Sequence, residues 1–294
     1  MTRAGDQAVR DEGERDGHPR RHSLADSLSD ADLRRWLPVV GAVLVIASLV
    51  PPLSTLARRY LFVESFQFCL FAIVCPALIV LGAPWRRLHR PRRGDGTHPE
   101  KSGAPPPLAD RLAASRDRRS PFLRGMVFLA VFIGVSLAWR VPPVLDGLAR
   151  HPGLVAAEAI TLLAAGIGLW LQLVWSPPLA SRLSGAQRAV IAALAMWSTW
   201  IAAYALGFSS QPLVHAYAGG SGLTVVADQE IAVGLVWAVA GVCFVPVIFA
   251  GLVSWLRDGG DIGEEFKQAF PDVGARAGVR GWQRPPRGPG APSG

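Results

Sequence analysis

The sequence predicts an all-α fold, a polytopic membrane helix bundle of about six transmembrane helices with cytoplasmic termini. Half of the 294 residues are hydrophobic and the mean hydropathy is +0.29. Only 18% of the residues are charged, whereas soluble domains average roughly 25%. The charges also crowd into segments between long apolar runs. This pattern excludes an ordinary soluble enzyme and a wholly disordered chain.

Six apolar stretches approach or exceed the roughly 18 to 20 residues that cross about 30 Å of hydrocarbon. They lie near residues 37–57, 61–84, 122–138, 153–175, 187–208 and 230–256. The first is too long, and begins too far along the chain, to be a cleaved signal peptide, so we expect an uncleaved helix. The third is the shortest. We expect Trp139 to anchor it at the interface and Arg140 to extend outward to water.

The predicted domain organisation follows from the same pattern. Residues 1–35 are expected to form a disordered cytoplasmic tail, residues 36–257 the transmembrane domain, and residues 258–294 a second disordered cytoplasmic tail. The loop 85–121 is rich in Arg, Gly and Pro and is expected to be disordered and cytoplasmic. Such a basic segment gains about 1 kcal/mol per cation near anionic lipid headgroups. It carries no interleaved aromatic residues that could stack on bases, so nucleic acid is not an expected partner.

The distribution of cationic residues predicts the orientation, because cationic loops resist translocation. The two tails and the loops 85–121 and 177–188 carry 25 Lys and Arg residues, and the alternate connections carry four. Both termini are therefore predicted to be cytoplasmic.

With this orientation, the polar groups of the apolar segments gather near the outer face. Glu64 and Gln67 fall in the first turns of the second segment, Glu158 lies early in the fourth, and residues 228–230 open the sixth. An ionisable residue at a helix centre costs about 2.5 to 3.5 kcal/mol on insertion scales, so such residues usually have a function or a partner. The alternative for the acids at helix starts is stabilisation of the helix dipole, worth about 0.3 to 1 kcal/mol.

We therefore take Gln67, Glu158, Asp228 and Gln229 as a candidate polar site, open to the outer aqueous phase, that docks a partner or holds a cation transiently. His151 and His215 lie in outer loops and are the candidate metal ligands. The cysteines follow no ligand or disulfide spacing and are typical buried small residues. No nucleophile elbow, phosphate loop or zinc motif is present, so enzymatic activity is not expected.

Three local patterns together resemble the CtaG-type cytochrome c oxidase assembly factors. The first is Cys75-Pro76 followed by an apolar run into Leu81-Gly82-Ala83-Pro84. The second is Val174-Trp175-Ser176-Pro177 with Arg182-Leu183-Ser184 after it. The third is Gln211-Pro212-Leu213, then Tyr217, then Ala227-Asp228-Gln229-Glu230. Their order and spacing cover residues 36–257.

The resemblance implies an integral membrane factor that assists copper delivery or insertion, or maturation of a haem-copper oxidase, from the outer face. It implies an oxidase subunit or another assembly factor as partner, and copper as a transient cofactor. The chain departs from the family pattern where the family carries histidines, because it has Phe68, Val155 and Ala159 there. These side chains cannot bind a metal, so we expect a member that acts without binding copper itself. The family also tends to have seven helices rather than six.

Two other functions remain open. A small-solute or proton-coupled transporter would line a pathway with the same acids, but the prolines near the midplane, Pro76 and Pro246, have no polar neighbour to receive a substrate. A scaffold or accessory subunit without a site would tolerate replacement of the acids.

Overall fold

The computed structural model describes residues 24–85, 120–174, 176, 181–207, 214, 216–217, 223–261 and 263. Within these ranges the chain forms helices and no strands. The helices are α1 (Leu24–Leu49), α2 (Leu53–Ala57), α3 (Leu61–Cys69), η1 (Leu70–Val74), α4 (Cys75–Gly82), α7 (Pro121–Trp139), α8 (Pro142–Arg150), α9 (Pro152–Leu173), α10 (Gly185–Gly207) and α11 (Val225–Arg257). The predicted all-helical bundle is confirmed.

Five of the described helical segments are long and apolar enough to cross a membrane. They are Leu61–Gly82, Pro121–Trp139, Pro152–Leu173, Gly185–Ala205 and Val225–Arg257. The first predicted segment, 37–57, is not among them and is not one helix. α1 ends at Leu49, Pro51 and Pro52 follow, and α2 is separate. Since proline disfavours helix in the residue before it, the apolar part of α1 is shorter than predicted.

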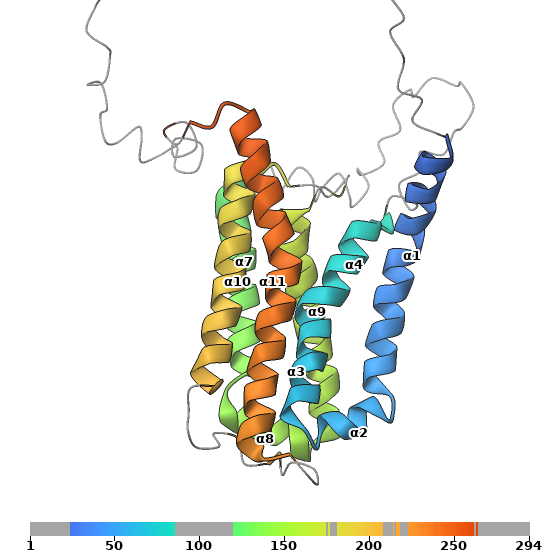
Figure 1. Cartoon of the computed structure of the whole chain (residues 1–294), viewed down its shortest axis with the longest axis vertical. Helices are drawn as coiled ribbons and strands as arrows, with labels where there is room; N and C mark the ends of the chain where they lie inside the picture. The colour runs from blue at the N-terminus through green and yellow to red at the C-terminus, as the bar shows by residue number, and fades with distance from the viewer. Residues whose placement is uncertain are drawn as a thin grey trace, which may run out of the picture.

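The start of α1 and the end of α11 lie at the same end of the bundle (Figure 1). α1 runs alongside α4. The long helices that follow, α7, α9, α10 and α11, run alternately down and up the bundle (Figure 1). Helix α1 already begins at Leu24, so part of the segment 1–35 is helical where a disordered tail was expected. The other predictions of disorder concern residues 1–23, most of the loop 85–121 and the chain after residue 263, which lie outside the described residues.

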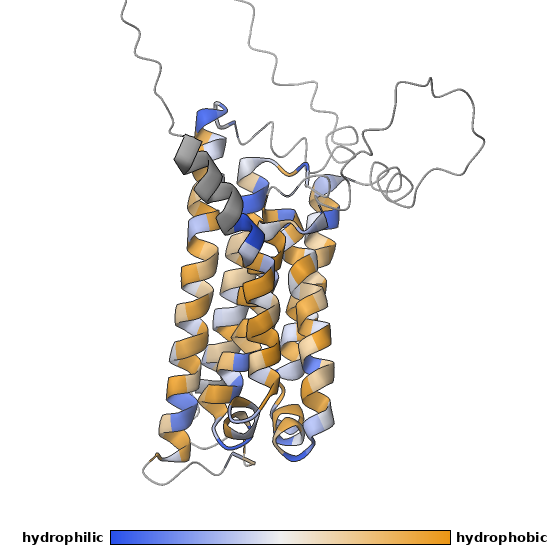
Figure 2. Ribbon diagram, turned by 90° about the vertical axis from the view of Figure 1, so that its right-hand side faces the viewer, coloured by the Kyte–Doolittle hydropathy of each residue, from blue (hydrophilic) through white to orange (hydrophobic). Residues whose placement is uncertain are grey.

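The surface of the bundle suits a lipid environment. Figure 2 shows hydrophobic residues along the length of the helices and hydrophilic ones concentrated toward the two ends. Large apolar side chains are exposed on the outside, among them Val242, Ile160 and Phe249. In water such a surface would be costly. It is therefore the exterior that a membrane-spanning bundle requires.

The second segment is interrupted in its middle by the π-helical turn η1, and Pro76 follows directly. A proline inside a helical run removes one backbone hydrogen bond and bends the axis. Gly166 of α9 lies against this bend, and a Cβ there would collide with the Ala72 carbonyl oxygen and the Pro76 ring. The bend makes α4 follow α1, whereas α3 packs against α11.

Candidate functional site

A buried ion pair joins two helices at the end of the bundle that holds α2 and α8. Arg140, the residue after α7, donates from Nη1 to Glu64 Oε2 of α3 at 2.8 Å. The same nitrogen lies 3.2 Å from Ser65 Oγ, and the guanidinium carbon lies 3.9 Å from the centre of the Phe68 ring. The side chains of Arg140 and Glu64 are only 7% and 5% exposed. The expectation that Arg140 extends outward to water is therefore wrong: it turns inward to a carboxylate.

Glu158 of α9 brings a second carboxyl group to this pair. Its carboxyl faces that of Glu64 at hydrogen-bonding range, and the residue is 2% exposed. Glu158 Oε1, Glu64 Oε1 and Arg140 Nη2 are all buried without a hydrogen-bond partner among the described residues. With both acids ionised, the cluster carries one uncompensated negative charge, which is costly in a buried site. The charge cluster Glu64, Arg140 and Glu158 therefore has a place for one more positive charge, either a proton or a cation.

An apolar layer lies beside the charge cluster at this end of the bundle. It consists of Leu145 and Leu148 of α8 together with Leu61, Val214, Tyr217 and Ala232. Tyr217 is 1% exposed, its hydroxyl lies 3.4 Å from the Leu145 carbonyl oxygen, and burial raises its pKa far above the ordinary range. Asp146 of α8 accepts a hydrogen bond from the Ala216 amide at 2.8 Å. α8 thus forms a cap together with Val214, Ala216 and Tyr217, and the acids are enclosed where an open site was expected.

Asp228, one of the predicted site residues, connects two helix starts. Its Oδ2 and Oδ1 accept hydrogen bonds from the Leu61 and Phe62 amides, each at 2.8 Å. These amides open α3 and have no partner within their own helix. Asp228 therefore caps a helix more than 160 positions away in the sequence, although it lies in the first turn of α11. α11 itself begins at Thr224, whose side chain accepts from the Ala227 amide.

The other predicted residues have separate surroundings. Gln67 donates from Nε2 to the Ser48 carbonyl oxygen at the end of α1. Gln229 is 2% exposed and lines a small cavity between α3, α7, α10 and α11. Gln67, Glu158, Asp228 and Gln229 are thus all buried near one end of the bundle, and their role as a site stays a prediction.

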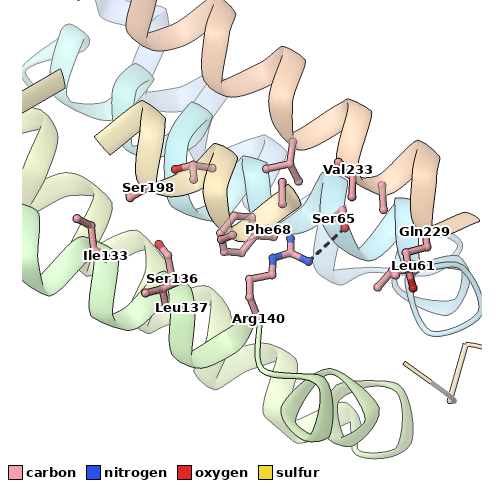
Figure 3. A pocket seen from close by; sticks show the side chains of 15 residues that line it. Leu61, Ser65, Phe68, Ile133, Ser136, Leu137, Arg140, Ser198, Gln229 and Val233 are labelled. Carbon is pink, nitrogen blue, oxygen red and sulfur yellow. Dashed lines mark hydrogen bonds between the residues drawn. The ribbon is translucent and has the colours of Figure 1, made fainter. Parts of the chain in front are cut away.

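The cavity beside Gln229 has about 20 Å³ of room, enough for about one water molecule. Figure 3 shows the Arg140 side chain reaching from the end of α7 toward Ser65 of α3, with Ser136 on α7 itself. Ser136 Oγ is buried and lacks a partner among the described residues. The cavity is lined mostly by apolar side chains, and Arg140 is the member of the charge cluster that reaches it.

Of the two candidate metal ligands, His151 and His215, only His151 lies among the described residues. It is exposed at the start of α9. Cys69 and Cys75 are buried, and Cys243 is partly buried. Among the described residues, no group of three or more His, Cys, Asp or Glu side chains could hold a metal ion.

Sequence reasoning placed Glu64 and Glu158 at one end but missed Arg140 and α8. The signal for α8 was present, since Pro142 and Pro143 stand where proline is accepted in a first helical turn. Two leucines, Leu145 and Leu148, follow three positions apart, which is the spacing of one helix face.

Comparison with known proteins decides the family. The model of the cytochrome c oxidase caa3 assembly factor family, Caa3_CtaG, matches residues 20–258. This chain belongs to that family. The searches of curated proteins and of solved structures found no match. The match confirms the resemblance predicted from the sequence and covers all of the helices from α1 to α11.

Proposed function

We propose that this chain assists the maturation of a haem-copper oxidase from the outer face of the cell membrane, without catalysing a reaction. The supporting observations are membership of an oxidase assembly family and a buried charge cluster at one end of a membrane bundle. More of the described cationic residues lie toward the other end, namely Arg34, Arg35, Arg124, Arg188 and Arg257, than at the end of the cluster, where Arg58, Arg59 and Arg150 lie. Because cationic segments stay in the cytoplasm, the charge cluster belongs to the outer half. The partner is an oxidase subunit or another assembly factor.

Copper enters this proposal as cargo of the assembly process. The charge cluster offers two carboxylates beside a guanidinium, and carboxylates suit harder cations than Cu(I), which prefers thiolate and thioether ligands. Its donor set therefore does not fit copper(I) binding. The proposal accordingly gives this chain a role in presenting or holding a partner while copper is inserted, and not in carrying the metal at this cluster.

Glu158 is the working group in the proposal. Glu64 already pairs with Arg140, whereas Glu158 Oε1 has no partner among the described residues. Movement of α8 and Tyr217 would open the cluster to the outer aqueous phase, where a cationic side chain of the partner could replace the missing positive charge. Docking would then pair the Glu158 carboxylate with the partner's cation and exclude water from both groups. This second ion pair would favour the docked state.

The test is complementation of a host strain that lacks this protein. Glu158→Gln keeps the size of the side chain but removes its charge, and Glu230→Gln is the matched control because Glu230 is exposed in the first turns of α11. We expect strains with E158Q to show a diminished haem-copper optical spectrum, lower copper content of the oxidase and several-fold lower oxidase activity, with E230Q unchanged.

The amount of each variant in the membrane is measured by immunoblot, so that loss of function is separated from loss of protein. Normal oxidase spectra with E158Q at normal abundance would contradict the role of the cluster and favour a scaffold without a site. Normal spectra in the strain lacking the whole chain would contradict the proposed function itself.

A further inference from the structure

A large apolar groove lies at the opposite end of the bundle from the charge cluster. It has a volume of about 540 Å³ and is lined by residues of η1, α4, α9, α10 and α11. Trp170 and Leu173 of α9, both 3% exposed, line it from the inside of the bundle. Leu81 on α4 and Ala250 on α11 line it and are exposed. The groove therefore opens sideways toward the lipid.

The groove follows from the bend at η1 and Pro76. α3 packs on α11 before the bend, and α4 packs on α1 and α9 after it. Figure 1 shows α4 leaning away from α11 toward α1. Trp170 still stacks on Phe244 of α11, with ring centres 5.4 Å apart and planes 6° from parallel. The helices beyond this stack leave the space open.

Two polar side chains line the groove at the cytoplasmic end of the helices. Ser254 lies in the last turn of α11, and Arg188 lies in the first turn of α10. Arg188 is half-buried, and its Nε lies 3.4 Å from the Ser184 carbonyl oxygen. A guanidinium has five N–H donors, so this contact leaves donors for an anion. The groove thus combines a long apolar wall with one cation at its membrane-surface end.

We propose that this groove binds one acyl chain of an anionic phospholipid of the surrounding bilayer, with the lipid phosphate on Arg188. Its volume is in the range of small-molecule sites, about 300 to 1,000 Å³, and apolar walls favour a hydrocarbon over water. A phospholipid places its charged headgroup at the membrane surface and its acyl chain below it. Arg188 lies at the membrane-surface end of the groove, where it would meet the headgroup, and the apolar walls lie deeper, where they would meet the chain. A transmembrane helix of a partner, the other possible occupant, would not require a cation at that place.

The experiment is native mass spectrometry of the full chain in detergent, with dioleoyl phosphatidylglycerol or dioleoyl phosphatidylcholine added. We expect one tightly retained lipid, with about fivefold preference for the anionic one, as one cation near a lipid surface provides. Arg188→Gln should abolish the preference, and Ala250→Leu should lower retention of both lipids by filling the groove.

Two residues of α11 provide matched controls. Arg257→Gln removes an exposed cation near the same end, and Ala238→Leu enlarges an exposed alanine that does not line the groove. Both should bind lipid like the unmodified chain. Equal retention of the two lipids by the unmodified chain, or equal retention by A250L and A238L, would overturn the proposal.

Loss of oxidase co-purification with A250L at unchanged lipid binding would assign the groove to a partner helix and would also overturn it. The Arg188 comparison remains decisive if A250L fails to fold. The lipid-retention outcomes do not depend on the proposed role of the charge cluster, because they are measured on the purified chain.

Discussion

Replacement of Asp228 by asparagine tests the structural role of the most deeply buried acid. The carboxylate accepts two backbone hydrogen bonds of 2.8 Å from the start of α3 and is 0% exposed. An asparagine oxygen replaces one acceptor, but its NH₂ group faces the other amide as a second donor. Hydrogen bonds to a charged group contribute about 1.5 to 3 kcal/mol each, and the charge at a helix start adds about 0.3 to 1 kcal/mol.

D228N should therefore lose about 2 to 4 kcal/mol by these contacts. We expect a loss near the lower value of this range, because the polar groups of a membrane protein also find hydrogen-bond partners in its unfolded state. For a chain of this size a loss of 2 kcal/mol lowers Tm by about 4 to 8 °C. The assay is thermal unfolding of the purified chain in detergent, with Glu230→Gln as the control for loss of an exposed acid two positions away. A Tm of D228N equal to that of E230Q would refute the capping role.

Three further predictions use the same stability assay. Arg140→Leu should cost about 3 to 5 kcal/mol because it leaves the buried carboxylates of Glu64 and Glu158 without a cation, and adding Glu64→Leu should restore part of the loss; an unrestored double variant would contradict the pairing. Gly166→Ala should cost about 1 to 3 kcal/mol by overpacking the bend, whereas Gly134→Ala, where a Cβ meets nothing within 4 Å, should cost little; equal effects would contradict the close approach. Burial raises the pKa of Tyr217. The stabilisation of the fold by the neutral Tyr217 side chain is therefore present below about pH 10 and is lost as the pH rises beyond that. Tyr217→Phe should match the unmodified chain at neutral pH, where its hydrogen bond of 3.4 Å is long, and should lose less stability in alkali; parallel pH profiles would contradict this.

The membrane-spanning helices could be predicted from the sequence because the length of an apolar run indicates such a helix directly. The predicted segments 61–84 and 153–175 agree with Leu61–Gly82 and Pro152–Leu173 within two residues at each end. The segment 37–57 was wrong because its apolar composition was given more weight than Pro51 and Pro52, which end α1. The start of α11 was set at residue 230 instead of Val225, because polar residues were taken as the boundary and the cap at Thr224 was overlooked.

The candidate site was predictable only in part. The sequence shows that acids fall near one end of several helices, and Glu64 and Glu158 lie there. It does not show that Arg140 turns inward to Glu64 or that Asp228 caps α3, because both contacts join residues far apart in the chain. The enclosure by α8 was missed because this nine-residue helix, although strongly amphipathic, is too short to be found by a search for apolar runs that span a membrane.

The claim that the charge cluster and its cap belong to the outer half of the membrane is tested most directly by cysteine accessibility in intact cells. Arg150 at the end of α8 and Arg257 at the end of α11 are both exposed, at opposite ends of the bundle. Arg150→Cys should react with a membrane-impermeant maleimide from outside, and Arg257→Cys should react only after the cells are opened. Labelling of R257C from outside, with R150C protected, would place the cluster on the cytoplasmic side and contradict the account.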